Sequence, residues 1–526
     1  MMSSLKEYIY RRRLRALLIS GLGLALMIFL GYKVEFDLMK ILRGLPNMMN
    51  LFRRMLRINP NYIGEVSAKL WETVEIACIS SLMGILISMP LSILISRNIA
   101  PNKFIWRGLN LVFALLRTIP SLVWAALLVS VFSIGKFSGI LALGVTATLA
   151  SLKLLKDSIE AIPQNVLDST IATGAKKFQV LKYCVFPTII EQSFAIFFMV
   201  LEINIRGATV LGLVGAGGIG QIMWRDLNHL RYDNLATLIL ILLITIFLID
   251  FISLRVRKGF RLKEKSYRSI DGFKAYKRRK NIGLGLLILG LVFLSYRAIN
   301  INGDRMRMGL EQGGLIVRRM LDVDWSYRDK LFKGLKESIY IALFATIIGG
   351  LAAFLISYFA SYNLCHNKYM VSLSKGLINI LRTFPSIVTA IIFFRGVGPG
   401  PLAGVMALSI YTTGVLTKLY SEVIESMNEN LINSVRVTGA SNFAVYRHGV
   451  IPATMPNFVS LVLYRLESNM RTSTILGIIG AGGVGTSLTM NITWRNWERV
   501  GLLILGIALS VALIDLISNA IRKRYI

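Results

Sequence analysis

The sequence predicts an all-α, polytopic membrane protein made of two tandem six-helix units, with about twelve transmembrane helices and pseudo-two-fold symmetry. Of its 526 residues, 54% are hydrophobic and only 17% are charged, and the mean hydropathy is +0.61. Soluble domains average roughly 25% charged residues. Long apolar runs recur along the chain, and the second half repeats the first at a constant spacing of 265 residues, the distance from Pro187 to Pro452.

Each transmembrane span is predicted from an apolar run. Runs without any charge cover residues 16–32, 76–96, 118–135, 383–394 and 396–417. Weaker runs cover 137–152, 184–201, 235–249, 282–296, 339–363, 450–464 and 500–514, and the spans around Arg117 and from 376 to 394 must each tolerate an arginine. A bilayer core needs roughly 17 to 25 residues of helix. Because each half has an even number of spans, both halves enter from the same side and the duplication is parallel.

The placement of the basic residues predicts the orientation. Lysine and arginine number 60 against 28 acidic residues, a net charge of +32. Residues 255–280 hold twelve basic and two acidic residues beside an apolar run, which is typical of a cytoplasmic loop and not of a nucleic-acid surface. We expect both termini on the cytoplasmic side of a bacterial cell (inner) membrane, and a division into residues 1–260, a basic linker 261–281 and residues 282–526. Residues 38–56 are expected to form an amphipathic surface helix.

No residue pattern indicates catalysis or a bound metal. Cys78, Cys184 and Cys365 and the three histidines show neither metal-ligand nor disulfide spacing. The phosphate-binding pattern G-x-x-x-x-G-K-[ST] does not occur in the sequence, so any ATP must be bound by another chain. No cofactor is expected in this chain.

The stretch GATVLGLVGAGGIG, residues 207–220, contains the literal pattern G-x-G-x-x-G. It returns as TSTILGIIGAGGVG at residues 472–485, and 11 of the 19 residues from Glu202 to Gly220 are identical to their partners. A dinucleotide-binding loop follows a strand and opens a helix within a βαβ unit, whereas this stretch follows an apolar run and is duplicated. The glycines are therefore not interpreted as a nucleotide site.

A long segment separates the fourth and fifth spans of each half, at residues 156–187 and 420–452. A helix that opens at Pro163, turns at Gly174 and restarts would give a helix-turn-helix along the membrane face. With a glycine 13 residues before a proline in each half, the segments resemble the coupling loops of bacterial ABC importer permeases, although the E-A-A positions are degraded to DST and NSV. The residues that this resemblance implies for ATPase coupling are Asp168, Gly174, Ala175, Pro187, Asn433, Gly439, Ala440 and Pro452.

The glycine stretch resembles the signature of phosphonate ABC transporter permeases. The pattern R-x-x-T-x-L-G-x-x-G-A-G-G-[IV]-G begins at Arg206 and again at Arg471, so the chain resembles two type I permease units fused in tandem. The resemblance implies a cytoplasmic ABC ATPase dimer that holds ATP and Mg²⁺, an extracytoplasmic phosphonate-binding protein, and import by alternating access.

Bundled glycines let backbones approach closely or bend sharply at membrane depth. We predict that they form a re-entrant gate near the outer face, with dense helix packing as the alternative. The predicted gate residues are Gly215, Gly217, Gly218, Gly220, Gly480, Gly482, Gly483 and Gly485.

Arginines inside apolar segments are the candidate substrate contacts. Arg117 and Arg382 each precede Thr-x-Pro-Ser, at a depth where a charge is costly. A guanidinium offers a planar donor fork that suits phosphate-like oxygens, and an arginine that snorkels or locks helices is the alternative. The pairs Glu202–Arg206 and Glu467–Arg471 are spaced for ion pairs on one helix face, with an anion station or gate latch as the alternative. The predicted path residues are Arg117, Thr118, Ser121, Arg382, Thr383, Ser386, Glu202, Arg206, Glu467 and Arg471.

The function expected from the sequence is that of a transmembrane permease, embedded in the lipid bilayer, of an ATP-driven importer for phosphonate or a related small phosphorus oxyanion. Phosphite and phosphate are alternative cargoes. An ion-coupled secondary anion transporter can also have six plus six spans, but the paired Gly-to-Pro segments speak against it. A membrane dehydrogenase that uses the glycine stretch is a more distant alternative.

Overall fold

The computed structural model describes residues 2–55, 57–100, 102–260, 303–365, 367–383 and 386–525. These residues form helices joined by turns, without a strand among them, which confirms the all-α prediction. The chain divides into two compact units. The first-half unit is Leu51–Asp322, and the second-half unit combines Met1–Asn50 with Val323–Ile526.

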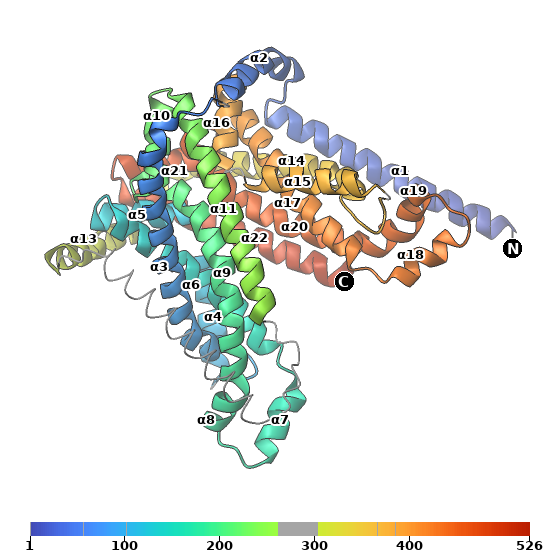
Figure 1. Ribbon diagram of the computed structural model, residues 1–526, viewed down its shortest axis with the longest axis horizontal. Coiled ribbons are helices and arrows are strands. Elements are labelled where there is room, and N and C mark those ends of the chain that lie inside the picture. The colour runs from blue at the N-terminus through green and yellow to red at the C-terminus, as the bar shows by residue number, and fades with distance from the viewer. Residues whose placement is uncertain are drawn as a thin grey trace. The chain divides into compact units, whose positions relative to one another are not determined.

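Four long helices form the body of the first-half unit: α3 (Ile63–Ile95), α6 (Lys136–Glu160), α9 (Phe186–Leu211) and α11 (Tyr232–Phe260). α3 lies against the other three (Figure 1). Small residues mark the contacts, as expected where helices associate in lipid by close packing. A side chain at Gly84 would collide with the backbone of Ala147, and the Ser80 hydroxyl donates to the Ile140 carbonyl across the same helix pair at 3.0 Å.

The second-half unit repeats this body with α14 (Arg328–Phe359), α17 (Pro401–Glu425), α20 (Ile451–Leu476) and α22 (Trp497–Tyr525). Gly349 of α14 lies so close to Thr412 of α17 that an added Cβ would be 2.7 Å from the Thr412 Cβ. The Asn469 amide on α20 donates to the hydroxyls of Thr346 at 2.8 Å and Thr412 at 2.9 Å. One buried asparagine therefore ties three helices together.

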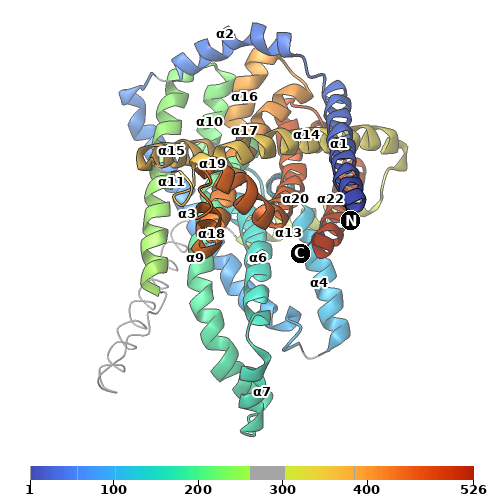
Figure 2. The same cartoon turned by 90° about the vertical axis from the view of Figure 1, so that its right-hand side faces the viewer.

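Each unit includes a segment from the other half of the chain. Helix α1 (Met2–Lys33; Figure 2) and α2 (Leu38–Arg54) up to Asn50 lie in the second-half unit. There Phe36 meets Phe344 edge-to-face at 5.6 Å, and Gly44 lies against the backbone of Gly396. Helix α13 (Gly303–Leu321) lies in the first-half unit against α5 (Ser121–Phe132). The repeat boundaries 1–260, 261–281 and 282–526 stay a prediction, because the compact units are a different division of the chain.

Seven described helices are long and apolar enough to cross a membrane, or nine if each of two bent pairs counts as one span. The other predicted spans are the shorter apolar helix Ser20–Lys33, α20 with its three charged residues, and residues 282–296, which lie outside the described part of the chain. Helix α2 has the expected amphipathic pattern, because apolar and polar residues each recur at spacings of three and four on opposite faces. The apolar face carries Leu38, Leu42, Leu45, Met49 and Phe52, and the polar face carries Lys40, Arg43, Asn47, Asn50 and Arg54.

Candidate functional site

The glycine stretch forms a tight helical hairpin in each unit. After α9, one 3-10 turn (Gly212–Val214) leads through Gly215, Gly217 and Gly218, with φ of 85°, 81° and 74°, into the short helix α10 (Ile219–Asn228). In the second-half unit, Gly480, Gly482 and Gly483 have φ of 80° to 81° before α21 (Val484–Thr493). Side chains other than hydrogen rarely tolerate these left-handed conformations, so the sequence needs glycine here.

The remaining glycines of the stretch permit close approach instead. Gly220 has an ordinary helical backbone, but a Cβ there would collide with the carbonyl of Thr209, and Gly485 stands in the same relation to Thr474. The short helix therefore folds back against the last turn of the long one. This geometry agrees with a chain reversal, and the role of the eight glycines as a gate remains a prediction.

A hydroxyl on the first long helix of each unit holds the hairpin in place. The Ile219 N–H, at the start of α10, donates to Thr73 Oγ1 at 2.7 Å, and the Val484 N–H donates to Ser338 Oγ at 3.0 Å. Thr73 and Ser338 are equivalent in the repeat, and both are fully buried. Sequence reasoning missed them; the signal was a hydroxyl retained at both equivalent positions of the repeat.

Replacing Thr73 by valine is expected to lower the free energy of unfolding by about 1–3 kcal/mol, because the buried Ile219 N–H would lose its partner. Ser338→Ala is expected to do the same in the other unit. Thermal unfolding of the purified chain in detergent measures the change. Thr245→Val is the matched control, since its hydroxyl donates to the Ile241 carbonyl of its own helix; an equal effect of T245V would contradict the assignment.

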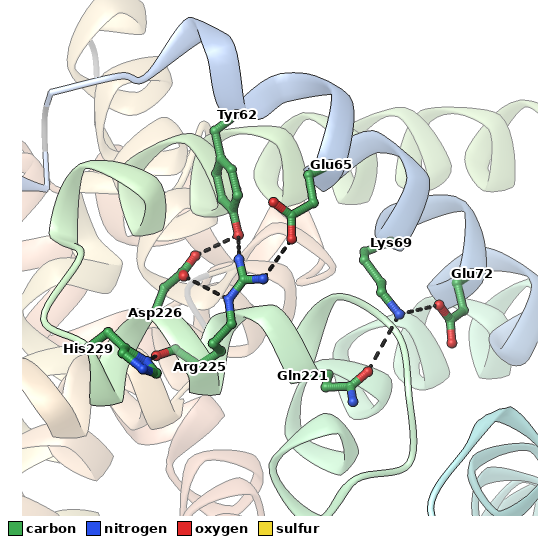
Figure 3. A network of polar contacts seen from close by, with 8 residues as sticks. All are labelled: Tyr62, Glu65, Lys69, Glu72, Gln221, Arg225, Asp226 and His229. Atoms are coloured by element: carbon green, nitrogen blue, oxygen red, sulfur yellow. Dashed lines mark hydrogen bonds and ion pairs between the residues drawn. The ribbon is translucent and has the colours of Figure 1, made fainter.

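A charged network joins α10 to the start of α3 (Figure 3). The Tyr62 hydroxyl donates to Asp226 Oδ2 at 2.6 Å and accepts from Arg225 Nη2 at 2.7 Å, while Arg225 Nη1 donates to Glu65 at 2.7 Å. The hydrogen bond to Glu65, followed by that to Asp226, raises the pKa of Arg225 above its ordinary value. The Asp226 carboxylate is fully buried, so these partners are what make its burial tolerable.

In the second-half unit, different residues join the short helix α21 to the start of the long helix α14. Asn491, the equivalent of Asp226, donates from its amide to the Tyr327 hydroxyl at 3.2 Å. The ion pair of this unit is formed at other positions, by Asp324 Oδ2 and Arg499 Nε, which lie 2.9 Å apart. A hydrogen bond from Ser326, together with Arg499, holds the pKa of Asp324 below its usual range. In the first-half unit the equivalent residues are Asn59 and Asn234, which form a neutral amide pair at 2.9 Å.

The Arg-Thr-x-Pro-Ser sequences lie at sharp breaks between helices. In the first-half unit α4 (Lys103–Thr118) and α5 meet at 87°, and in the second-half unit α15 (Lys368–Thr383) and α16 (Ser386–Val397) meet at 84°. The spans predicted here are therefore bent pairs and not single straight helices, because a proline removes the helical hydrogen bond at the break.

The two breaks gather the predicted path residues in two separate sets. Arg117 is half-buried at the end of α4, and Ser121 begins α5. The Thr118 hydroxyl donates to the Leu115 carbonyl of its own helix at 2.6 Å, so it is engaged in this conformation. Arg382 and Ser386 flank the second break. Contact between these residues and a substrate is still a prediction.

Both predicted Glu-Arg pairs form. Arg206 Nη2 pairs with Glu202 Oε1 on α9, and Arg471 Nη1 pairs with Glu467 Oε1 at 2.9 Å on α20. The four-residue spacing places each pair on one face of its helix, in the favourable order with the acid first. An ion pair is the role that the sequence favoured for these residues.

The segments before α9 and α20 form the predicted helix-turn-helix. α7 (Gln164–Ala172) ends at Gly174 with φ of 79°, and α8 (Lys177–Val180) follows. α18 (Glu429–Arg436) and α19 (Asn442–Val445) repeat the pattern around Gly439 with φ of 78°. Pro187 and Pro452 are the second residues of α9 and α20, directly after the π-helical turns Leu181–Val185 and Tyr446–Val450 that join these helices to α8 and α19.

These segments expose large apolar side chains. Phe178 is 73% and Phe443 62% exposed, and Val437 is 88% exposed. Asp168 lies on α7, and Ala175 follows the turn at Gly174. Asn433 on α18 and Ala440 after Gly439 are their equivalents, and Ala440 packs against buried residues of the second-half unit. In the first-half unit, the helix-turn-helix of α7 and α8 comes before α9 and the glycine hairpin comes after it. These two elements therefore lie at opposite ends of α9, which is about 39 Å long (Figure 1).

The described residues contain no group of His, Cys, Asp or Glu that could hold a metal ion. The architecture instead defines a duplicated membrane body, with a helix-turn-helix at one end of each unit and a glycine hairpin at the other. The sequence matches the family of binding-protein-dependent transport system inner membrane components at residues 66–262 and again at 345–525. The chain therefore belongs to this family.

Individual relatives specify the class further. The chain is 27% identical over 496 residues to the phosphate-import permease protein PhnE of Mycolicibacterium smegmatis, which covers 94% of this chain and 92% of that protein. It is 27% identical over 247 residues to the phosphite transport system permease protein PtxC of Stutzerimonas stutzeri, covering 47% of this chain and 90% of that protein. The carnitine transport permease protein OpuCB of Listeria monocytogenes is 26% identical over 163 residues, 31% of this chain and 73% of that protein. Two permease units are thus fused in tandem in this chain.

Proposed function

We propose that the chain is the transmembrane permease of an ATP-driven importer for phosphonate or a related small phosphorus oxyanion. The observation that carries this proposal is the helix-turn-helix present once in each half, which ends on exposed aromatic residues at Phe178 and Phe443. Such a rigid, apolar element suits the cleft of a separate motor protein. The named relatives that import phosphate and phosphite support the choice of cargo.

The partners follow from this assignment. A cytoplasmic ABC ATPase dimer binds one coupling segment with each subunit and holds the ATP and Mg²⁺, while this chain holds no cofactor and hydrolyses nothing. An extracytoplasmic binding protein delivers the anion at the glycine-hairpin end. Both termini then lie in the cytoplasm, on the side of the coupling segments. ATP-driven closure of the motor moves both segments and rocks the two halves between inward-open and outward-open states.

The test of this function is reconstitution of the chain in proteoliposomes with its ATPase and with candidate binding proteins. We expect ATP hydrolysis to rise when a binding protein loaded with phosphonate, phosphite or phosphate is added. If only a chemically unrelated ligand such as carnitine stimulates hydrolysis, the proposed cargo is wrong.

Replacing Phe178 and Phe443 together by aspartate is expected to weaken ATPase binding by roughly 30-fold or more at each coupling segment. Each phenylalanine would lose an apolar anchor worth about 2 kcal/mol, and a buried unpaired charge adds to the loss. Co-purification of the ATPase with the tagged chain measures it. Leu230→Asp, in the loop after α10 at the other end of the first-half unit, is the matched exposed control. Equal co-purification of both variants would place the motor elsewhere.

A further inference from the structure

A buried arginine without a counter-charge lies in the middle of α20. Arg465 is only 5% exposed, and no carboxylate lies within ion-pair distance of it among the described residues. Its nearest acid on the same helix, Glu467, is paired with Arg471. A charge in such a setting is strongly unfavourable unless something of opposite sign compensates it.

The guanidinium is held by neutral groups only. Its Nε donates to Thr412 Oγ1 and its Nη1 to Ser468 Oγ, both at a long 3.4 Å, and its central carbon lies 4.6 Å from the centre of the Tyr411 ring. Its Nη2 is buried without a hydrogen-bond partner. Ser409, one helical turn before Thr412 on α17, also has a buried hydroxyl without a partner. Arg465 therefore forms a cluster with Tyr411, Thr412 and Ser468 in which its Nη2 is unsatisfied, and Ser409, one turn away on α17, has a second buried polar atom without a partner.

The first half has no such cluster. The residues equivalent to Ser409, Tyr411, Thr412, Arg465 and Ser468 are Gly144, Thr146, Ala147, Val200 and Ile203. By contrast, Asn469 and its equivalent Asn204 both survive and both donate to a hydroxyl on the first long helix of their unit, Thr346 and Ser81. The shared scaffold contact is thus present twice, and the buried cation occurs in one half only. A purely structural requirement of the fold would be expected in both.

We propose that Arg465 and the surrounding hydroxyls form an anion-binding station for the transported phosphorus oxyanion, unique to the second half of the chain. This inference rests on the proposed function for the identity of the anion. A phosphonate or phosphate oxygen accepts from Nη2, and a second oxygen accepts from the Ser409 hydroxyl. Binding offsets the cost of the buried cation, because the anion brings the counter-charge that the protein does not supply. The two halves of the permease consequently contribute unequally to the path.

The direct test is binding to the purified full chain in dodecyl maltoside, a detergent without a phosphate group. Isothermal titration with inorganic phosphate and with methylphosphonate is expected to give a dissociation constant that rises at least tenfold in Arg465→Gln and in Arg465→Val, which installs the first-half residue. Arg465→Lys should retain part of the affinity, because it keeps the charge and loses the planar fork. Val200→Ala, at the equivalent position of the first half, is the matched control and should bind as the native chain does.

A second variant covers the case in which the Arg465 substitutions fail to fold. Ser409→Ala combined with Ser468→Ala removes two small hydroxyls and should weaken phosphate binding several-fold, whereas Ser473→Ala should not, since that hydroxyl donates to the Met470 carbonyl of its own helix. Native-like phosphate affinity in Arg465→Val, or in the double serine variant, overturns the proposal. Phospholipid retained stoichiometrically by the native chain and lost in Arg465→Val, without any phosphate binding, overturns it in favour of a lipid site.

Failure of this inference is distinguishable from failure of the proposed function. If the complete complex imports a phosphorus oxyanion and Arg465→Val imports it at the native rate, the importer stands and the anion station does not. If the complex imports no phosphorus oxyanion but Arg465→Gln still loses phosphate binding, the anion station stands and the assigned cargo does not.

Discussion

Leucine at both Gly217 and Gly482 is expected to abolish uptake by the assembled complex. Both glycines have φ near 80°, a conformation that costs other residues about 1–3 kcal/mol each. A Cβ at position 217 would also lie 2.8 Å from Glu72 Oε1, and one at position 482 would collide with Glu337, the equivalent acid. The two carboxylates are at the ends of flexible side chains and can move aside, so the main cost of leucine is the strained left-handed backbone of each hairpin. A gate built from strained hairpins could not close. Uptake of labelled substrate into proteoliposomes measures the loss.

Gly376→Leu provides the control for this pair. Gly376 lies within the helix α15 with an ordinary backbone, and an added Cβ would meet nothing within 4 Å. It should leave uptake intact. Uptake at the native rate by the double variant would contradict a role of the glycines as a gate. Failure of the double variant to assemble with the ATPase would show that the glycines serve helix packing.

Arg117→Gln together with Arg382→Gln is expected to reduce uptake at least tenfold while the complex still assembles. A charge-assisted hydrogen bond is worth about 1.5–3 kcal/mol, so the loss of one at each break accounts for a reduction of this size. Both arginines lie in the last turn of a helix just before a sharp bend. Initial rates of substrate uptake at saturating ATP measure the effect.

Arg107→Gln is the matched control, since Arg107 lies on the same helix as Arg117 and is exposed. Its charge is removed equally, but no substrate role is assigned to it. Unchanged uptake in the double variant would refute a path through the two breaks. Loss of assembly would assign the arginines to helix locking.

Local pattern was enough to predict much of this fold. Apolar runs gave the long helices, and the 265-residue repeat predicted two equivalent bodies with the same order of elements. A turn between two helices was predicted at Gly174, and the left-handed φ of 79° there, with 78° at the equivalent Gly439, agrees with it. The Glu202–Arg206 and Glu467–Arg471 pairs followed from a four-residue spacing on one helix. In all these cases the interacting residues are near each other in sequence, or the repeat doubles the signal.

Features that depend on distant partners were not predicted. Nothing local to Thr73 says that its hydroxyl accepts from the N–H of Ile219, 146 residues away. The assignment of α1, and of α2 up to Asn50, to the second-half unit likewise depends on contacts such as Phe36 with Phe344. Pro120 and Pro385 indicated an interruption of helical hydrogen bonding before Ser121 and Ser386. They did not predict bends as sharp as 87° and 84°, because both arms of each bend are apolar and resemble one span. Arg465 was missed because the two halves were compared for identical residues, whereas Arg465 differs from its equivalent in the first half, Val200.

We propose that this chain moves its cargo only when a separate ATPase drives it. The test is uptake of a labelled phosphorus oxyanion into proteoliposomes. Vesicles contain either the lone chain or the complete complex, and each is supplied with either internal ATP or a proton gradient. We predict uptake only by the complete complex supplied with ATP and a loaded binding protein. Uptake by the lone chain in response to a proton gradient would contradict the account and make the protein an ion-coupled carrier.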